Sequence, residues 1–317
     1  MIVTLKDDLK YKHGGGSLLV YLPTVGTYRF DNISDEDLKL FFGLKIGIEL
    51  VNPTKFVQTL CKLGVIKERV AQKDALTNRT RSWIANFGLD GITKYESARQ
   101  KSVLILGCGG VGSIVIQQLL QLGFRSLSVV DDANVNISDL NRQGIYSKED
   151  VGRRKVDCCA SYACEEFDIS HFRTFYEHIK TPENLNRIIR NVDPILTFCC
   201  IDKPVSHYKS LVTRAVLGEA TGVIFCEVGV FEAFIGPLLV TDLDKDSYLK
   251  SKVRDLKNFD GVTTSNSSIC FSNCLSASFM TQLGFNYLCD IDCCDGSSLY
   301  RYDFRNLEVL RLEHGFD

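Results

Sequence analysis

The sequence predicts an α/β protein with a Rossmann-like, mostly parallel sheet covered by helices on both faces, preceded by a winged-helix-like module. Three observations carry this prediction. The first 70 or so residues combine a hairpin with two amphipathic helices, and strands and helices then alternate from about residue 100. At 317 residues the chain also exceeds the size that one hydrophobic core comfortably serves. We therefore expect two domains, 1–72 and 73–317.

The N-terminal segment carries turn and cap signals in the order that such a module needs. Apolar runs at 17–22 and 26–30 flank a Pro-containing turn, which predicts a β-hairpin. Ser34 precedes a run of acidic and apolar residues and is a candidate N-cap for a first helix. Pro53 and Gly64 bracket a second amphipathic run as start and stop signals. A mixed connector, 81–98, follows.

The larger segment alternates strand and helix, which is typical of parallel βαβ units. The predicted strands are 102–106, 126–130, 172–175, 194–200 and 222–226. The predicted helices are 112–122, 150–166, 182–190 and 204–217. Beyond about residue 245 the pattern is less regular, with one helix expected at 272–288 and strands near 299–311.

Composition limits the function and the compartment. With 45% apolar and 24% charged residues and a net charge of -2, the chain shows no global attraction to nucleic acid or to anionic membranes. It has neither an apolar signal core at its start nor a run of about 18 apolar residues, so we expect a cytoplasmic protein. The 13 Cys residues include adjacent pairs, which favours reduced, buried thiols over disulfides. No nucleophile can be assigned among them, and Cys199, Cys200 and Cys226 are expected to be core thiols.

The stretch "VLILGCGGVG" predicts a nucleotide site. A buried strand runs into a glycine turn and an amphipathic helix, so that backbone N–H groups can approach a phosphate at the positive end of the helix. Asp131 ends the next strand, 19 residues after the last of these glycines, where its carboxylate can accept from a ribose hydroxyl. The pattern does not identify the nucleotide, because dinucleotide enzymes carry the same letters. The candidate turn residues are Gly107, Gly109, Gly110 and Gly112.

The loop that follows, "ISDLNRQGIYSKEDVGRRK", indicates a polyanion. Arg142 and Lys155 both lie close after the glycine turn in the chain, and two fixed cations suit a triphosphate whose departing pyrophosphate gains charge. The alternative is that Arg142 pairs with Asp139 and that Lys155 belongs to a solvated face.

Three motifs resemble those of the ubiquitin-activating-enzyme-like (ThiF/MoeB/MccB) adenylating family: "GCGGVG", "VVDDANVNISDLNRQ" and "DVGRRK", over about 79–240. The resemblance implies ATP and Mg2+ as cofactors. It implies that Arg142, Gln143 and Lys155 contact the ATP phosphates and that Asp131 binds the ribose. Asp139 lies among these contacts, where the family usually has Asn.

The resemblance also implies two roles farther along and before the glycine turn. Asp202, in "TFCCIDKP", takes the place of the family's magnesium ligand. Arg81, in "TNRTRSW", takes the place of an arginine that reaches into the partner subunit's site, which implies a homodimer. Many relatives carry two Cys-x-x-Cys pairs for zinc. The cysteines available here are Cys270, Cys274, Cys289, Cys293 and Cys294, and their spacing does not suit a zinc knuckle, so zinc is not expected.

The segment before Arg81 resembles the leader-recognition domain of the family's peptide-modifying members, MccB of the microcin C pathway and PaaA of the pantocin pathway. This implies adenylation of a carboxylate on a ribosomally made precursor peptide, in the biosynthesis of an antibiotic-like peptide natural product. Four alternatives remain: adenylation of a ubiquitin-like sulfur carrier's C-terminus, an NAD-dependent oxidoreductase, a leader-binding partner without catalysis, and an N-terminal extension that serves only dimerisation or structure. The peptide, its activated carboxylate and the final acceptor stay open.

Overall fold

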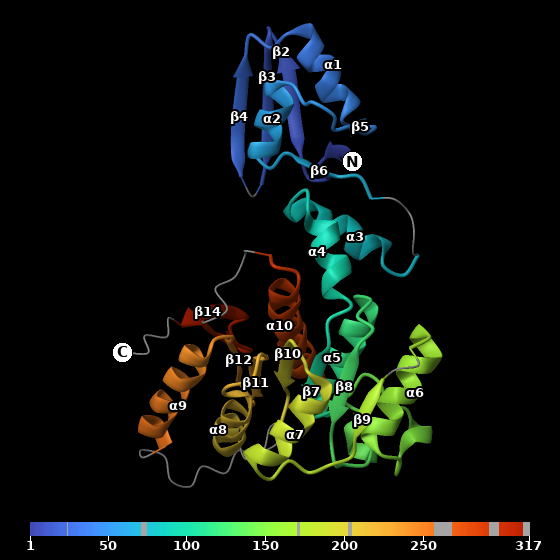
Figure 1. Cartoon of the computed structure of the whole chain (residues 1–317), viewed down its shortest axis with the longest axis vertical. Helices are drawn as coiled ribbons and strands as arrows, with labels where there is room; N and C mark the ends of the chain where they lie inside the picture. The colour runs from blue at the N-terminus through green and yellow to red at the C-terminus, as the bar shows by residue number, and fades with distance from the viewer. Residues whose placement is uncertain are drawn as a thin grey trace. The chain divides into compact units, whose positions relative to one another are not determined.

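The computed structural model forms two compact units, Met1–Ser97 and Ala98–Asp317 (Figure 1). The structure describes residues 1–23, 25–70, 75–169, 172–201, 205–256, 268–291 and 298–312. The boundary between the compact units falls after the predicted domain boundary at residue 72. The assignment of 1–72 to leader recognition stays a prediction.

The first unit holds two small antiparallel sheets. One has the strand order β2-β3-β4 and the other β5-β1-β6. Their strands are β1 (Ile2–Leu5), β2 (Lys10–Gly14), β3 (Ser17–Leu22), β4 (Gly26–Asp31), β5 (Ile48–Glu49) and β6 (Ile66–Glu68). The helices are α1 (Asp35–Gly43), α2 (Lys55–Lys62), α3 (Asn78–Ile84) and α4 (Gly91–Ala98), with a 3-10 turn at Ala85–Phe87.

The predicted hairpin and both predicted N-terminal helices are present. Ser34 caps α1, since its hydroxyl accepts from the Asp37 N–H at 3.1 Å. Alternate residues of β3, Leu18 and Val20 among them, are fully buried against helix residues such as Phe41 and Leu60. β2 was not predicted, because "KYKHG" has no apolar alternation; it forms by pairing with β3.

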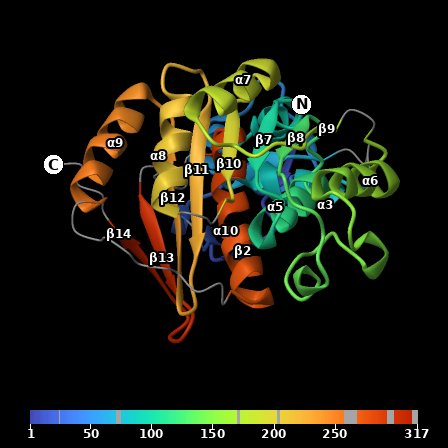
Figure 2. The same ribbon diagram turned by 90° about the horizontal axis from the view of Figure 1, so that it is seen from below.

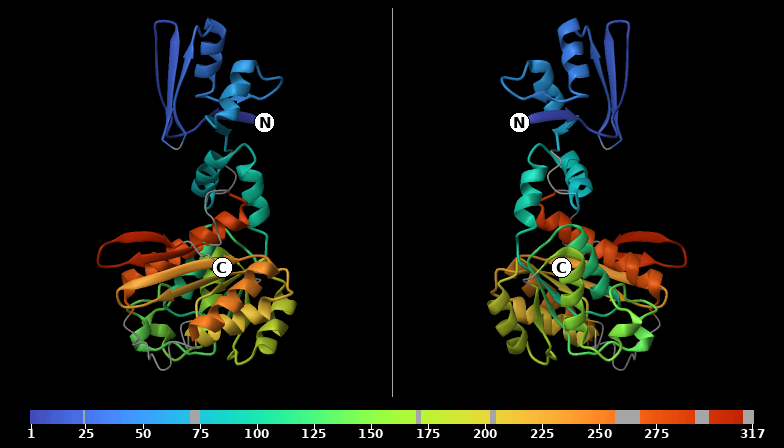
Figure 3. Two further views of the ribbon diagram at one scale, coloured as in Figure 1. Left: turned by 90° about the vertical axis from the view of Figure 1, so that its left-hand side faces the viewer. Right: turned by 90° about the vertical axis from the view of Figure 1, so that its right-hand side faces the viewer.

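The second unit is built on one eight-stranded sheet with the order β14-β13-β12-β11-β10-β7-β8-β9. The five strands β9, β8, β7, β10 and β11 are parallel, and β12 to β14 add antiparallel strands at one edge. Figure 3 shows the β13–β14 hairpin, in red, at that edge. The strands are β7 (Val103–Leu106), β8 (Leu127–Val130), β9 (Arg173–Phe175), β10 (Leu196–Cys199), β11 (Gly222–Val228), β12 (Glu232–Leu239), β13 (Leu299–Asp303) and β14 (Glu308–Leu312).

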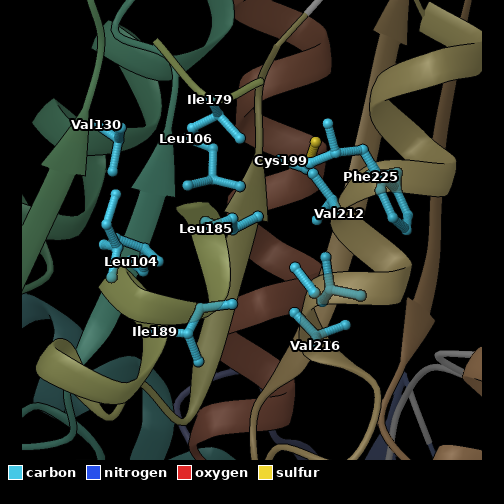
Figure 4. Packing of buried hydrophobic residues seen from close by; sticks show 14 of the residues in the cluster. Leu104, Leu106, Val130, Ile179, Leu185, Ile189, Cys199, Val212, Val216 and Phe225 are labelled. Carbon is cyan, nitrogen blue, oxygen red and sulfur yellow. The ribbon is translucent and has the colours of Figure 1, made fainter. Parts of the chain in front are cut away.

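Helices cover both faces of this sheet, as predicted. They are α5 (Gly110–Gln121), α6 (Lys155–Phe167), α7 (Pro182–Val192), α8 (Val205–Val216), α9 (Asp242–Leu256) and α10 (Cys270–Leu288). α10 packs against α5 and against β10 to β12. α7, α8 and α9 lie side by side in that order, as Figure 2 shows. The core on the α7–α8 side includes Leu104, Leu185 and Val212, and α10 passes behind it in Figure 4.

This arrangement confirms the predicted fold class, and three local expectations were wrong. The connector expected at 81–98 is mostly helical, because it holds the end of α3, the 3-10 turn and α4. The region after residue 245 is not irregular up to Leu256, because α9 covers it. Its sequence has few apolar residues, and Lys245 and Tyr248 are buried among its described side chains. The helix expected at 150–166 begins at Lys155, since Lys148–Asp150 forms a separate 3-10 turn in which Asp150 accepts from the Ser147 N–H. No helix in the described ranges has the length and apolar character needed to span a membrane.

A glycine inside α10 provides a stability test of the packing between α10 and the sheet. A Cβ at Gly284 would lie 2.3 Å from the Phe198 ring, so Gly284→Ala must push β10 and α10 apart. Helix propensity alone would make this change stabilising by about 1 kcal/mol. We expect destabilisation by about 1–3 kcal/mol in urea unfolding, because overpacking outweighs propensity. Gln121→Ala, at an exposed position of α5, is the control, and a Gly284→Ala protein as stable as wild type would contradict the packing.

Candidate functional site

The glycine turn connects β7 to α5 at the carboxyl end of the sheet. Gly107 has a φ of +89°, and its N–H donates to the Val130 carbonyl at 2.8 Å. A Cβ at Gly112 would lie 1.8 Å from the Gly107 carbonyl oxygen, so the first turn of α5 closes only over glycine. A Cβ at Gly110 would lie 2.6 Å from Oδ1 of Asn273. The turn therefore needs three of its four glycines for packing, whereas Gly109 has open space around it.

A cavity of about 350 Å³ opens beside this turn, at the carboxyl ends of the central parallel strands. Its lining brings together residues that lie far apart in the sequence. Among the predicted site residues it includes Gly107, Gly109, Gly110, Asp131, Arg142, Gln143 and Lys155. Gly112 and Asp139 support the cavity without lining it. The loop after β8 is thus folded back onto the glycine turn, as the interpretation of "NRQ" and "DVGRRK" requires.

Asp131 closes β8 and is held by backbone donors. Its carboxylate accepts from the Cys108 N–H at 2.6 Å and from the Ala133 N–H at 2.8 Å. Burial raises the pKa of Asp131, and these two donors act against the rise. Each oxygen keeps a lone pair for a further donor, so the fixed carboxylate can accept from a ribose hydroxyl.

Asp139 gathers the polar residues that follow the glycine turn. One carboxylate oxygen accepts from Gln143 Nε2 at 2.8 Å and from an Arg142 guanidinium nitrogen at 3.3 Å. The other lies 3.2 Å from Lys155 Nζ and accepts from the Asn136 N–H at 3.0 Å. Asp139 is 5% exposed and Lys155 is 7% exposed, so this ion pair is shielded from solvent. The alternative of a solvated Lys155 is therefore wrong, whereas the predicted Arg142–Asp139 pair is present alongside the cation cluster.

Gln143 bears on the fit of a magnesium ion. Its Nε2 donates to Asp139, which orients the amide so that Oε1 lies away from the carboxylate, and that buried Oε1 has no hydrogen-bond partner among the residues that the structure describes. Asp131, Asp132 and Glu177 also line the cavity. Carboxylate and amide oxygens are the ligand type that magnesium and its bound waters prefer, but the described residues contain no group of three or more His, Cys, Asp or Glu side chains arranged to hold a metal ion.

Two predicted residues are not brought to this cavity by the described structure. Asp202, the predicted magnesium ligand, lies outside the described residues. Arg81 lies in the first unit, on α3, where it is buried and pairs with Glu96 on α4, while no described residue is a hydrogen-bond partner of its Nε. The role of Arg81 in a partner subunit's site remains a prediction.

The cavity includes residues that the sequence did not single out. Asp132 pairs with Nδ1 of His178 at 2.7 Å, and both line the cavity. The Tyr146 hydroxyl donates to the Cys108 carbonyl at 2.8 Å, and this hydrogen bond holds the glycine turn in place. Asn273 reaches the turn from the start of α10. Asp132 could have been identified as a cavity residue because it follows Asp131 directly in the chain, whereas no sequence motif marks Asn273 or Tyr146.

The cysteines at this end of the sheet have the character expected of core thiols. Burial raises the pKa of Cys199 to about 11 and that of Cys226 to about 12, and it also raises the pKa of Cys200. At neutral pH these thiols are protonated and poor nucleophiles. Cys293 and Cys294 lie outside the described residues, and elsewhere no cluster of three or more potential metal ligands is found.

Solved structures of similar fold cover nearly the whole chain. Escherichia coli MccB, in a crystal structure with ATP, aligns with a TM-score of 0.77 and 15% identity over 98% of this chain and 96% of that one. A structure of MccB with AMPCPP and the peptide MccA gives a TM-score of 0.76, also at 15% identity. PaaA aligns at 0.65 with 20% identity, over 81% of this chain and 90% of that one. At these identities the likeness shows the fold.

Curated relatives resemble part of the chain in sequence. The adenylyltransferase and sulfurtransferase uba4 of Aspergillus fumigatus is 30% identical over 192 residues, which is 56% of this chain and 37% of that protein. The NEDD8-activating enzyme E1 catalytic subunit of Caenorhabditis elegans is 30% identical over 87 residues, or 20% of its length. The chain thus spans well under half of the length of these relatives. The model of the ThiF family matches residues 78–283, and with the glycine turn and cation cluster in place the chain belongs to the ThiF family.

Proposed function

We propose that this protein is an ATP- and Mg2+-dependent adenylyltransferase that activates a carboxylate of a ribosomally made precursor peptide, leading to peptide modification or cyclisation. The observation that carries the proposal is the pair of buried or half-buried cations, Arg142 and Lys155, held at the cavity beside the glycine turn. A nucleotide site of this kind presents fixed positive charge to a polyphosphate. The crystal structure of MccB with ATP supports ATP as the nucleotide.

The reaction assigns a role to each part of the site. The peptide carboxylate attacks the α-phosphorus of ATP, a bond forms between them, and the bond from that phosphorus to the bridging oxygen breaks, so pyrophosphate leaves with the electron pair. Arg142 and Lys155 neutralise the charge that develops on the departing pyrophosphate, and Gln143 lies beside them. The backbone N–H groups of Gly109 and Gly110, at the start of α5, donate to a phosphate, and the Asp131 carboxylate accepts from a ribose hydroxyl. Magnesium, which Asp202 is proposed to hold, would add positive charge at the phosphates.

The N-terminal unit supports a peptide over other substrates. Its sheet β2-β3-β4 has two edge strands, and an unpaired edge can accept an extended peptide as an added strand. MccB, whose fold matches over 98% of this chain, was crystallised with the peptide MccA. We infer that the first unit holds the leader of the precursor while its reactive carboxylate enters the cavity.

A second function is favoured by the curated relatives. Their printed names couple adenylyltransferase with sulfurtransferase activity, which favours the C-terminus of a ubiquitin-like sulfur carrier as the substrate. The same cation cluster serves either carboxylate. The match to uba4 covers 56% of this chain, whereas the match to MccB covers 98%, and the peptide assignment rests on that difference. An NAD-dependent oxidoreductase is disfavoured. Its nucleotide site needs an acid for the ribose, as Asp131 provides, but hydride transfer does not need the two cations Arg142 and Lys155.

We propose that the protein acts as a homodimer. Some of the exposed apolar residues of the second unit lie near the start of α10 and on the β13–β14 hairpin. They include Phe271, Leu275, Val309 and Leu310, and Leu275 and Val309 line one apolar groove of about 250 Å³. An apolar surface of this kind is typical of a subunit interface. A second copy seated there would bury these side chains.

The phosphate role of the cations predicts a division between catalysis and peptide binding. With ATP, magnesium and a short peptide encoded beside the gene, Arg142→Ala and Lys155→Ala are each expected to slow pyrophosphate release by at least about 100-fold. Leader affinity in calorimetry should stay within about twofold, since the leader binds the other unit. Arg153→Ala, which removes an arginine of the same loop outside the cavity, is the control. A wild type that binds peptide with nanomolar affinity but releases no pyrophosphate would contradict adenylation.

The proposed role of Arg81 in trans predicts complementation. Arg81→Ala and Lys155→Ala proteins should each be inactive, and a heterodimer of the two has one site that keeps both residues. We expect the mixture to regain up to about a quarter of wild-type activity, because half of the randomly assorted dimers are mixed and each has one complete site. Native mass spectrometry of the mixture verifies that heterodimers form. Mixed dimers without activity would show that Arg81 and Lys155 serve the same subunit's site.

A further inference from the structure

Asp139 is fully engaged before any nucleotide arrives. Each of its two oxygens has two partners: Gln143 and Arg142 on one, Lys155 and the Asn136 N–H on the other. A carboxylate offers about four acceptor positions, so none remains for a metal ion. Asp139 is therefore not placed to be a magnesium ligand, and its contacts are with the groups that the proposed function assigns to the phosphates.

The charge at this site differs from that of a site with a neutral residue at position 139. Two cations and one carboxylate leave a single net positive charge, where an uncharged side chain would leave two. The effect is strong because Asp139 and Lys155 are both at least nine-tenths buried, and charges shielded from water interact more strongly. Arg142 is half-buried and donates at the same time to the Ser138 carbonyl at 2.7 Å, so its guanidinium is also fixed.

We propose that Asp139 is a positioning residue that holds Arg142, Gln143 and Lys155 ready for the triphosphate, and that its charge weakens the site's hold on pyrophosphate. The proposal rests on the proposed function and deepens it, by assigning a role in product release. Lys155 and Arg142 contact the Asp139 carboxylate at all times, so bound pyrophosphate interacts with cations whose charge is partly neutralised. Asp139 thus lowers the affinity of the site for polyphosphate. It also fixes the positions of Arg142, Gln143 and Lys155 and allows the pyrophosphate product to dissociate.

The test uses inorganic pyrophosphate, ATP and AMP as probes in titration calorimetry, with magnesium present and without any peptide. Asp139→Asn keeps the shape and, with its amide oxygen toward Arg142 and Gln143, those two hydrogen bonds, while it removes the charge and the ion pair with Lys155. We expect it to bind pyrophosphate and ATP about tenfold more tightly than wild type, and AMP unchanged within about twofold, since AMP lacks the β- and γ-phosphates. Asp139→Ala removes the hydrogen bonds as well and should lose most of that gain, because Arg142 and Gln143 are then unrestrained.

A matched control separates local from global charge. Asp150→Asn removes a carboxylate of the same loop that pairs with Arg153 outside the cavity, and it should leave pyrophosphate affinity unchanged. Unchanged or weaker pyrophosphate binding by a folded Asp139→Asn protein would overturn the charge role, and equal affinities of the Asn and Ala variants would overturn the positioning role. If Asp139→Asn does not fold, Asp139→Ser tests the charge in its place. A wild type that binds neither ATP nor pyrophosphate would instead overturn the proposed function itself.

Discussion

The buried contact between Asp139 and Lys155 is the constraint on which the site depends. A lysine that is 7% exposed needs a partner, because an unpaired buried charge costs several kcal/mol. Asp139 supplies that partner, and its second oxygen fixes Gln143 and Arg142. The loop after β8 is thereby folded onto the carboxyl end of the sheet instead of extending into solvent. Its cations are in place before a ligand binds, so they need little reorganisation when charge develops.

The sheet supplies the frame for this contact. Because β7, β8 and β10 are parallel and adjacent, the residues that follow them meet at one edge: the glycine turn, Asp131 and the Cys200 carbonyl. Gly107 approaches that carbonyl so closely that its own missing Cβ would lie 3.0 Å from the oxygen. Tyr146 then ties the turn to the loop that carries the cations, through the Cys108 carbonyl. The backbone of the parallel strands thus sets the shape of the cavity, and the Asp139 carboxylate sets the positions and net charge of its cations.

Most of the fold was predictable, because strand–helix alternation and glycine turns are local signals. The polar cluster was predictable in its members Arg142, Gln143 and Lys155 but not in its organisation. Asp139 differs from the family's usual Asn, and only the structure shows that one carboxylate holds all three. Asn273 was out of reach, since it comes to the glycine turn from a helix more than 150 residues later in the chain. β2 and α9 were missed because their sequences carry few apolar residues and gain their stability from pairing and packing.

The central claim is that a carboxylate oxygen attacks the α-phosphorus of ATP at this cation cluster. The most direct measurement is isotope transfer from a precursor peptide whose carboxylates carry oxygen-18. When the acyl adenylate is captured at its acyl carbon, the attacking oxygen stays on phosphorus, so the account predicts AMP that contains one oxygen-18 atom by mass spectrometry. Pyrophosphate should contain none. AMP without the label, formed while the peptide is consumed, would contradict adenylation and point to attack on ATP by a group other than the carboxylate.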